Sequence, residues 1–312
     1  MSGKSSHETV LISEAIDALS ICEGGCYVDA TFGRGGHSRL ILENLGAQGN
    51  LIIFDKDPEA IEAARIIREK DERLQIAHTP FGDLEEQLTA LGLSEGIDGI
   101  LFDLGVSSPQ LDNAERGFSF LRDGPLDMRM NPDVGQSAEQ WINSAAEAEI
   151  ADVLYQFGEE RHSRRMARRV ILERAEKRIT RTGELAEIIK EANPAWERDK
   201  HPATRAFQGI RIFINDELGE LERGLEQALK MLKVGGRLVV ISFHSLEDRM
   251  VKRFIAKQAK GDSFPRGLPI SQDMLSPKLN PIGKRIKASA LEVDRNTRSR
   301  SAVMRVAEKI AQ

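Results

Sequence analysis

The chain has 312 residues, of which 40% are hydrophobic and 30% charged, so it can bury a sizeable core in one large or two moderate domains. Its apolar runs are far shorter than the roughly 20 residues that cross a bilayer, and its polar beginning lacks signal-peptide character. We therefore expect a cytoplasmic protein without membrane contact. The net charge of −5 argues against a protein that coats nucleic acid indiscriminately.

Strand and helix patterns alternate in the first third of the chain. Strands are expected at 26–30, 50–54, 74–77 and 99–104, with helices from about Ser38, from Pro58 after the capping residue Asp57, and over 83–92. Such alternation predicts an α/β fold with a parallel sheet covered by helices on both faces.

A helical insertion is expected after the fourth strand. The next convincing strand, 236–243, lies about 130 residues further on, whereas a whole βαβ unit needs only about 30. Helical patterns fill the interval at 137–145, 147–157, 162–177, 183–192 and 203–232. We expect a sheet domain made of 1–111 and 213–312, interrupted by a helical domain at 112–212. The helix 215–232 would return the chain to the sheet, and 300–306 alternates like a final strand.

The two cysteines, Cys22 and Cys26, have no clustered histidines near them in the sequence. A structural zinc site needs four such ligands. We expect reduced, structural thiols and no metal.

A glycine-rich turn follows the first strand, and the second strand ends at Asp55. Gly33, Gly35 and Gly36 have no Cβ, so the backbone can approach a ligand at a helix N-terminus. A carboxylate at the next strand end can accept hydrogen bonds from two ribose hydroxyls. The pattern predicts a nucleoside-cofactor site.

Other candidates follow neighbouring strands. His37 lies in the glycine turn, Phe81 offers an apolar face for an aromatic base, and Asp103 ends the fourth strand before the polar loop 104–110. Ligands of open α/β sheets bind beyond the carboxyl ends of the strands, so these residues should share one crevice. A carboxylate at Asp103 can hold a cationic or amino group near the reacting centre.

Seven collinear segments carry a more specific resemblance. They are 7–11, 29–38, 102–112, 116–120, 124–130, 201–208 and 241–249. These segments closely resemble the bacterial small-subunit ribosomal RNA methyltransferase H family. The resemblance implies a Rossmann-like methyltransferase fold that uses S-adenosylmethionine. It also implies methyl transfer to the N4 amine of a cytidine in the decoding region of 16S rRNA.

The resemblance also implies which residues contact the cofactor. They are Gly35, Gly36, His37, Asp55, Phe81, Asp103 and Gln110. One departure concerns the amine site, because many amino-methyltransferases have an Asp/Asn/Ser-Pro-Pro-aromatic loop. This chain has Ser107-Ser108-Pro109-Gln110 without an aromatic residue. The sequence therefore leaves open which group binds the amine.

Direct in-line attack by an exocyclic amine on the methyl group needs no covalent intermediate. Methylation of cytosine C5 usually requires a cysteine nucleophile, and neither cysteine lies near a fourth- or sixth-strand loop. Orientation then supplies most of the catalysis. Asp103, the Ser108 hydroxyl and the carbonyls around Pro109 are the candidate acceptors, and the sequence leaves the choice among them open.

Candidate RNA contacts lie in the insertion. The arginine-rich segment 161–178 includes Arg164, Arg165 and Arg168, and a basic loop contains His201 and Arg205. Such a face can neutralise phosphates, although a charge run also occurs as a merely solvated face. The expected partner is 16S rRNA in the 30S subunit, with free rRNA and the oligomeric state left open.

Two other functions remain candidates on sequence grounds. A nicotinamide dehydrogenase is disfavoured because the turn lacks Gly-x-Gly-x-x-Gly spacing and no acid/base pair for hydride transfer follows. An rRNA-binding assembly factor that kept the fold as a scaffold is the non-enzymatic alternative.

Overall fold

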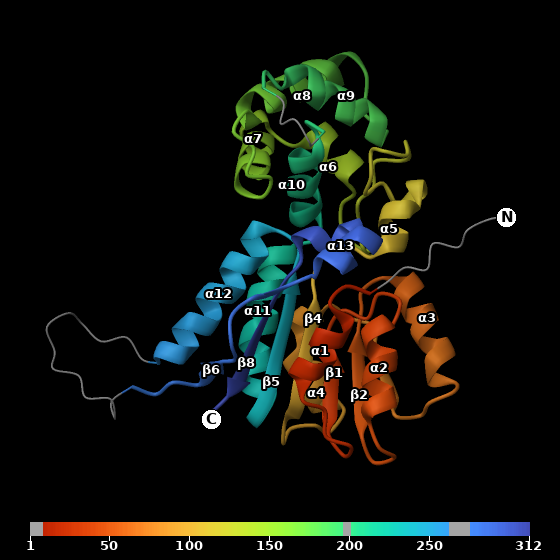
Figure 1. Ribbon diagram of the computed structural model, residues 1–312. Coiled ribbons are helices and arrows are strands. Elements are labelled where there is room, and N and C mark those ends of the chain that lie inside the picture. The colour runs from red at the N-terminus through yellow and green to blue at the C-terminus, as the bar shows by residue number, and fades with distance from the viewer. Residues whose placement is uncertain (1–8, 196–200, 262–274) are drawn as a thin grey trace, which may run out of the picture. The chain divides into compact units, whose positions relative to one another are not determined.

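The computed structural model describes residues 9–195, 201–261 and 275–312, so His7 and Glu8 of the first motif lie outside the described residues (Figure 1). The chain divides into two compact units, one formed by Met1–Gly105 with Leu218–Gln312 and the other by Val106–Glu217. The insertion expected at 112–212 lies within the second unit. None of the described helices is both long and apolar enough to span a membrane.

The first unit is built on a mostly parallel sheet. Its described strands are β1 (Cys26–Asp29), β2 (Asn50–Phe54), β3 (Leu74–Ala77), β4 (Ile97–Asp103), β5 (Leu232–Ser242), β6 (Leu279–Pro281), β7 (Ile286–Lys287) and β8 (Val303–Lys309). They follow the order β3-β2-β1-β4-β5-β8-β6, with β7 also paired to β8. β1 to β5 are parallel, whereas β8 is antiparallel to its neighbours. The predicted Rossmann-like class is confirmed.

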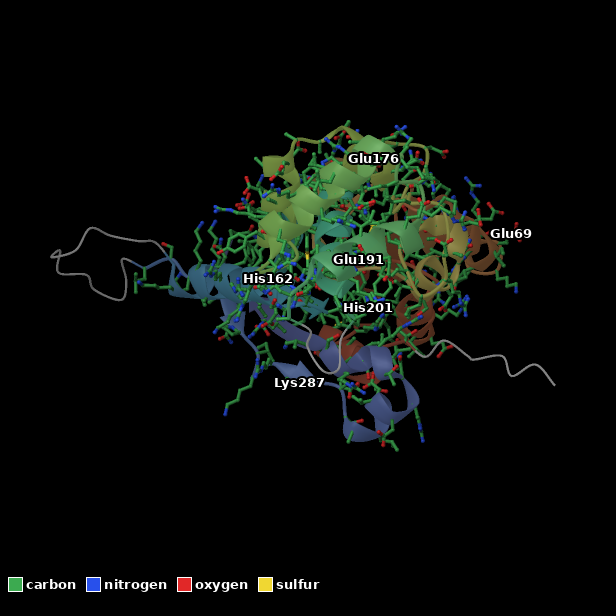
Figure 2. The ribbon with its side chains drawn as sticks, turned by 90° about the horizontal axis from the view of Figure 1, so that it is seen from above. Glu69, His162, Glu176, Glu191, His201 and Lys287 are labelled. Atoms are coloured by element: carbon green, nitrogen blue, oxygen red, sulfur yellow. The ribbon has the colours of Figure 1, made fainter. Side chains whose placement is uncertain are left out.

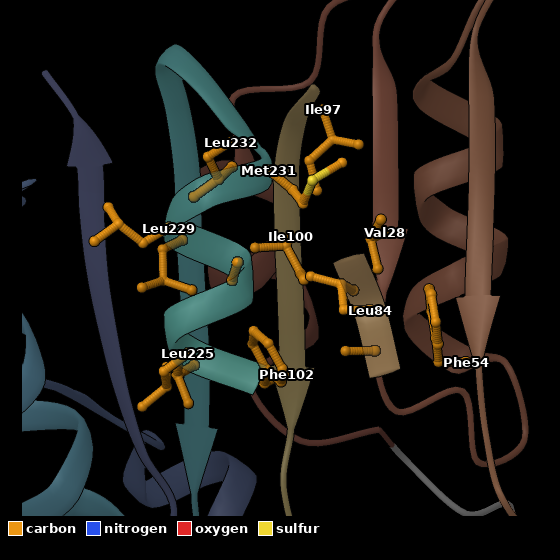
Figure 3. Packing of buried hydrophobic residues seen from close by; sticks show 14 of the residues in the cluster. Val28, Phe54, Leu84, Ile97, Ile100, Phe102, Leu225, Leu229, Met231 and Leu232 are labelled. Carbon is orange, nitrogen blue, oxygen red and sulfur yellow. The ribbon is translucent and has the colours of Figure 1, made fainter. Parts of the chain in front are cut away.

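Helices cover both faces of this sheet, as predicted. They are α1 (Ile12–Leu19), α2 (Gly36–Asn44), α3 (Pro58–Arg68), α4 (Leu84–Ala90), α11 (Glu217–Met231), α12 (Ser245–Lys260) and α13 (Ala290–Arg295). Alternate residues of each strand enter opposite cores because successive side chains point to opposite faces. On β4, Ile100 and Phe102 pack with Leu225 and neighbouring residues of α11 (Figure 3), whereas Leu101 enters the core that contains α1, α2 and α3. Burial on both faces explains why the strands read as continuous apolar runs.

The second unit is helical around its own core. Its described helices are α5 (Ser108–Asp112), α6 (Ala138–Ser144), α7 (Glu147–Gln156), α8 (Ser163–Glu176), α9 (Thr182–Ala192) and α10 (Thr204–Ile214). Trp141, Leu154 and Ile210 are among its buried residues. This separate core is what a folded insertion requires.

The expected helix 215–232 is present as α11, and it is separated from α10 because Asp216 has φ 49° and the Asn215 amide binds the backbone of Met128 and Met130. Two other sequence expectations differ from the structure. β5 begins before the expected residue 236. The last strand begins at Val303 rather than 300, since 297–301 forms a 3-10 turn.

Candidate active site

The glycine turn is tight for reasons within the protein. Gly33 and Gly35 have φ values of 55° and 75°, in the left-handed region that favours glycine. A Cβ on Gly35 would lie 2.7 Å from the Phe32 ring, and one on Gly36 would clash with the Thr9 hydroxyl. Packing therefore accounts for these two glycines whether or not a ligand approaches them.

Asp29, at the end of β1, holds the turn together. Its Oδ2 accepts a hydrogen bond from the Ser38 hydroxyl at 2.6 Å, and its Oδ1 accepts one from the Thr31 N–H at 3.2 Å. Burial raises the pKa of Asp29 to about 6, although both bonds oppose the shift. The sequence interpretation missed this residue, whose signal was an acid in the last position of an apolar strand.

Asp55 lies directly beside the turn, as the nucleoside-site prediction required. Its Oδ2 accepts from the Gly33 N–H at 2.8 Å and its Oδ1 from the Asp57 N–H at 2.9 Å. Burial raises the pKa of Asp55 to about 7, and the charges of Asp57 and Asp29 add to the shift. A carboxylate has about four acceptor positions, so two backbone bonds leave capacity for ligand hydroxyls.

His37 and Asp103 meet at the same edge of the sheet, with His37 Nδ1 3.6 Å from Asp103 Oδ2. The His37 side chain is 4% exposed. Burial lowers its pKa to about 4, although a hydrogen bond to the Val10 backbone acts in the opposite direction. The ring is therefore neutral at pH 7. Within the described residues, His37 Nε2 and Asp103 Oδ1 are buried without hydrogen-bond partners. Buried polar atoms are nearly always paired, so these two atoms point to a ligand.

Asp103 lies in an acidic environment. Burial raises its pKa well above the usual value, and the charges of Asp29 and Glu247 raise it further. Its backbone N–H donates to the Thr31 hydroxyl at 2.6 Å, which fixes the strand end against the turn. A cationic group placed here would relieve the repulsion between these carboxylates.

Phe81 is held by residues that the sequence analysis did not identify. Its N–H donates to Glu220 Oε1 at 2.9 Å, and Glu220 Oε2 accepts from Lys56 Nζ at 2.6 Å. The Phe81 ring meets Phe102 edge-on, with centroids 5.3 Å apart. Glu220 comes from α11, far along the chain, so no local pattern around Phe81 could have revealed it.

The structure thus brings Gly33, Gly35, Gly36, His37, Asp55, Phe81 and Asp103 to the carboxyl edge of one sheet. Ser108, Pro109 and Gln110 belong to the second unit, where they begin α5. Gln110 is buried, and its Oε1 accepts from the Ser107 N–H at 2.8 Å in a capping box. Pro109 occupies the first helical turn, a position that suits proline.

The nine cations of 161–181 divide into two groups. Five are engaged within the second unit. Arg169 pairs with Glu173 and Glu191, and Arg174 donates to the Ile142 carbonyl. Lys177 pairs with Glu184, Arg178 with Glu139, and Arg181 with Asp123. Arg161, Arg164, Arg165 and Arg168 are exposed and form no ion pair with any described residue. His162 and Glu176, labelled in Figure 2, mark the two ends of α8.

The basic loop of the second unit is partly engaged internally. The exposed His201 ring lies 4.6 Å from the Phe120 ring, and its Nδ1 accepts from the Ala203 N–H. Arg205 is half-buried and donates to the Glu159 carbonyl at 3.4 Å.

Both cysteines are free thiols, as expected. Cys22 is exposed, whereas Cys26 is buried on β1, where burial raises its pKa to about 11. A thiol with a raised pKa is a poor source of thiolate, which argues against Cys26 as a nucleophile. Cys26 is the first residue of β1 and Cys22 precedes it, so both come before the strand rather than after its carboxyl end.

The strand order and the glycine turn after β1 define a Rossmann-like protein, and the strand-end carboxylates beside that turn make a candidate cofactor site. The chain belongs to the MraW methylase family, whose model matches residues 4–310. Membership confirms the predicted class, a methyltransferase that uses S-adenosylmethionine, and contradicts the dehydrogenase alternative.

Sequence relatives agree with this assignment. The chain is 55% identical over 305 residues to ribosomal RNA small subunit methyltransferase H of Marinomonas sp. (strain MWYL1), covering 98% of this chain and 97% of the relative. Two solved structures are also similar. A putative rRNA-methylase from Clostridium thermocellum has 12% identity and a TM-score of 0.46 and covers 98% of each chain. A putative methyltransferase from Streptococcus mutans, in complex with SAH, has 12% identity and a TM-score of 0.43 and covers 97% of this chain and all of that one.

Proposed function

We propose that this protein transfers a methyl group from S-adenosylmethionine to the N4 amine of a cytidine in the decoding region of 16S rRNA. The main structural support for this chemistry is the buried Oδ1 of Asp103, which has no hydrogen-bond partner among the described residues and lies beside a neutral His37. The name of the Marinomonas relative supports small-subunit rRNA as the substrate class. We place the reaction in the cytoplasm and on the 30S subunit.

The residues of the first unit fit the cofactor. Asp55 has free acceptor positions for ribose hydroxyls, Phe81 presents a partly exposed ring for the adenine, and His37 and Asp103 offer orphaned polar atoms. The cofactor supplies a methyl group on a positively charged sulfur. The acidic surroundings of Asp103 favour a cation at that edge of the sheet.

The protein's part in the reaction is orientation and proton acceptance. The amine nitrogen forms a bond to the methyl carbon as the carbon–sulfur bond breaks, and a proton of the amine goes to an acceptor. Asp103 is suited to that step because its raised pKa makes its carboxylate a stronger base than an exposed aspartate. The Ser108 hydroxyl and the carbonyls around Pro109 are the alternative acceptors. The covalent route to C5 methylation needs a cysteine at the site, whereas Cys26 is the first residue of β1 and Cys22 precedes it, before the strand rather than after its carboxyl end.

We assign substrate recognition to the second unit, with Arg164, Arg165 and Arg168 as phosphate contacts. Their exposure and lack of ion pairs with described residues support this role, because an unpaired cation can bind a phosphate without first losing an internal salt bridge. His201 and Arg205 are weaker candidates, since both already bind neighbouring residues of the unit.

The test is the chemical identity of the product. Purified protein, methyl-labelled S-adenosylmethionine and either 30S subunits or free 16S rRNA are incubated, and the rRNA is digested to nucleosides. Mass spectrometry should find N4-methylcytidine. The appearance of 5-methylcytidine would contradict the proposed chemistry, and RNA binding without any methyl transfer would favour the assembly-factor alternative.

A further inference from the structure

The C-terminal part of the first unit carries a concentration of positive charge that the glycine-turn site does not use. Between β6 and β8, the exposed cations are Lys284, Arg285, Lys287, Arg295 and Arg300. None of them forms an ion pair with any residue in the described ranges. We call these five residues the C-terminal basic patch. The protein as a whole has a net charge of −5, so the patch is a local reversal of sign.

Few acids oppose the patch. The segment 284–300 contains only Glu292 and Asp294 as acids, and Glu292 is engaged, because its Oε1 accepts from the Leu11 N–H at 2.8 Å. Asp294 is exposed and has no ion pair with a described residue. The segment 284–300 therefore keeps a net positive charge on its exposed surface.

Sheet register places the patch at the same edge as the candidate site. Asp103 is paired with Ile241, Ile241 with Met304, and Met304 with Ile286, so these residues form one row across the sheet. Neighbouring strands lie about 4.8 Å apart, so the backbone of Ile286 is about 14 Å from that of Asp103. Lys287 is the next residue toward the carboxyl edge, and Figure 2 labels it on the C-terminal part of the chain.

A second connection ties the patch to the site. α13, which ends at Arg295, is anchored by the bond from Glu292 to Leu11, and the adjacent Val10 backbone binds His37. The 3-10 turn that contains Arg300 runs directly into β8, whose first residue pairs with the last residue of β5. Arg295 and Arg300 therefore lie at the carboxyl edge of the sheet with the site residues.

We propose that the C-terminal basic patch binds the phosphate backbone of the RNA strand next to the target base. The proposal rests on the proposed function, because it takes RNA as the substrate. RNA is the polyanion whose regular phosphates match several cations held along one edge. A distance of about 14 Å is one that a few nucleotides can span.

The test replaces Lys287, Arg295 and Arg300 with Gln in the full chain and measures binding to 30S subunits and to free 16S rRNA at several salt concentrations. Each lost phosphate contact removes about 0.7 from the log–log salt slope for single-stranded RNA, so the slope should fall by about 2. The affinity for S-adenosylmethionine and the thermal unfolding midpoint should not change. If the triple variant unfolds, Lys287→Gln alone should lower the slope by about 0.7.

The matched control replaces Arg68, Lys257 and Lys260 with Gln. These three cations are exposed on the same unit, without ion pairs to described residues, in the last turns of α3 and α12. Both helices begin beyond the carboxyl ends of strands and run back along the sheet, so their last turns lie away from the site. The control should keep the wild-type slope.

Equal slopes for wild type and patch variant, or an equal fall in the control, would overturn the proposal. So would wild-type binding without salt dependence. Because binding is measured without chemistry, failure of the proposed function is seen separately. It would appear as RNA-bound wild-type protein that produces no N4-methylcytidine.

Discussion

Asp103 combines three properties that rarely coincide in a structural residue. Its pKa is raised well above the usual value by burial and nearby acids, its Oδ1 has no partner among the described residues, and its side chain remains 23% exposed. Burying an unpaired carboxyl costs stability, so a ligand or a reaction is the simplest reason to keep it.

Replacing Asp103 with Asn should lower methyl transfer by about 100-fold or more while changing RNA affinity little, because orientation and proton acceptance act mainly on the rate. Single-turnover rates and equilibrium titrations measure the two effects separately. Asp17→Asn, an exposed acid on α1 of the same unit, is the control and should behave as wild type. Near-normal turnover of the Asp103 variant would transfer the role to Ser108.

The buried acids also make stability depend on pH. Asp29 and Asp55 have pKa values raised to about 6 and about 7, chiefly by burial. Their folded-state pKa values exceed the unfolded ones, so the folded protein keeps protons that the unfolded chain has already released. The free energy of unfolding contributed by these groups therefore falls as the pH rises from about 4 to about 7.

Asp55→Asn should remove its share of this dependence. Chemical denaturation without cofactor gives the free energy of unfolding of both proteins. The value for the wild type minus the value for the variant should decrease steadily as the pH rises from about 4 to about 7. A difference that stays constant, or that grows with pH, would show that Asp55 is charged throughout. Saturating S-adenosylmethionine should stabilise the wild type more than the variant, since the variant loses the proposed ribose acceptor.

At the scale of elements, α8 shows how pairing decides which charges are available. Its exposed Arg164, Arg165 and Arg168 are spaced so that they share a helix face, while Arg169 of the same helix is bound by Glu173 and Glu191. Paired and unpaired arginines therefore occur on one helix, and only the unpaired ones are candidates for phosphate contact.

Changing Arg164, Arg165 and Arg168 to Gln should weaken binding to 30S subunits and flatten its salt dependence by roughly 0.7–0.9 per lost phosphate contact. Lys177→Gln with Arg178→Gln is the matched control, because acids already compensate both cations. Titrations at several salt concentrations give the slopes. Equal changes in the two variants would reject a specific RNA contact for α8, and S-adenosylmethionine binding should be unchanged in both.

At the scale of the whole molecule, the two units have separate cores. The first holds the candidate cofactor residues around a sheet whose strands are buried on both faces, and the second is helical. The interval between β4 and β5 predicted this division. The compact units nevertheless begin and end a few residues outside the expected 112–212, so the loop of Ser108, Pro109 and Gln110 belongs with the helices rather than with the sheet.

The sequence by itself determined the features that depend on local patterns. Continuous apolar runs predicted the parallel strands, Asp57 and Pro58 predicted the start of α3, and the strand ends predicted that Asp55 lies beside the glycine turn. The nucleoside site at that turn stays a prediction. Tertiary structure alone decided which carboxylates are buried, which arginines are paired and what holds Phe81. Those outcomes depend on partners such as Glu220 and Glu139, which lie far away in sequence. Burial and ion pairing arise from such long-range contacts, and no local pattern encodes them.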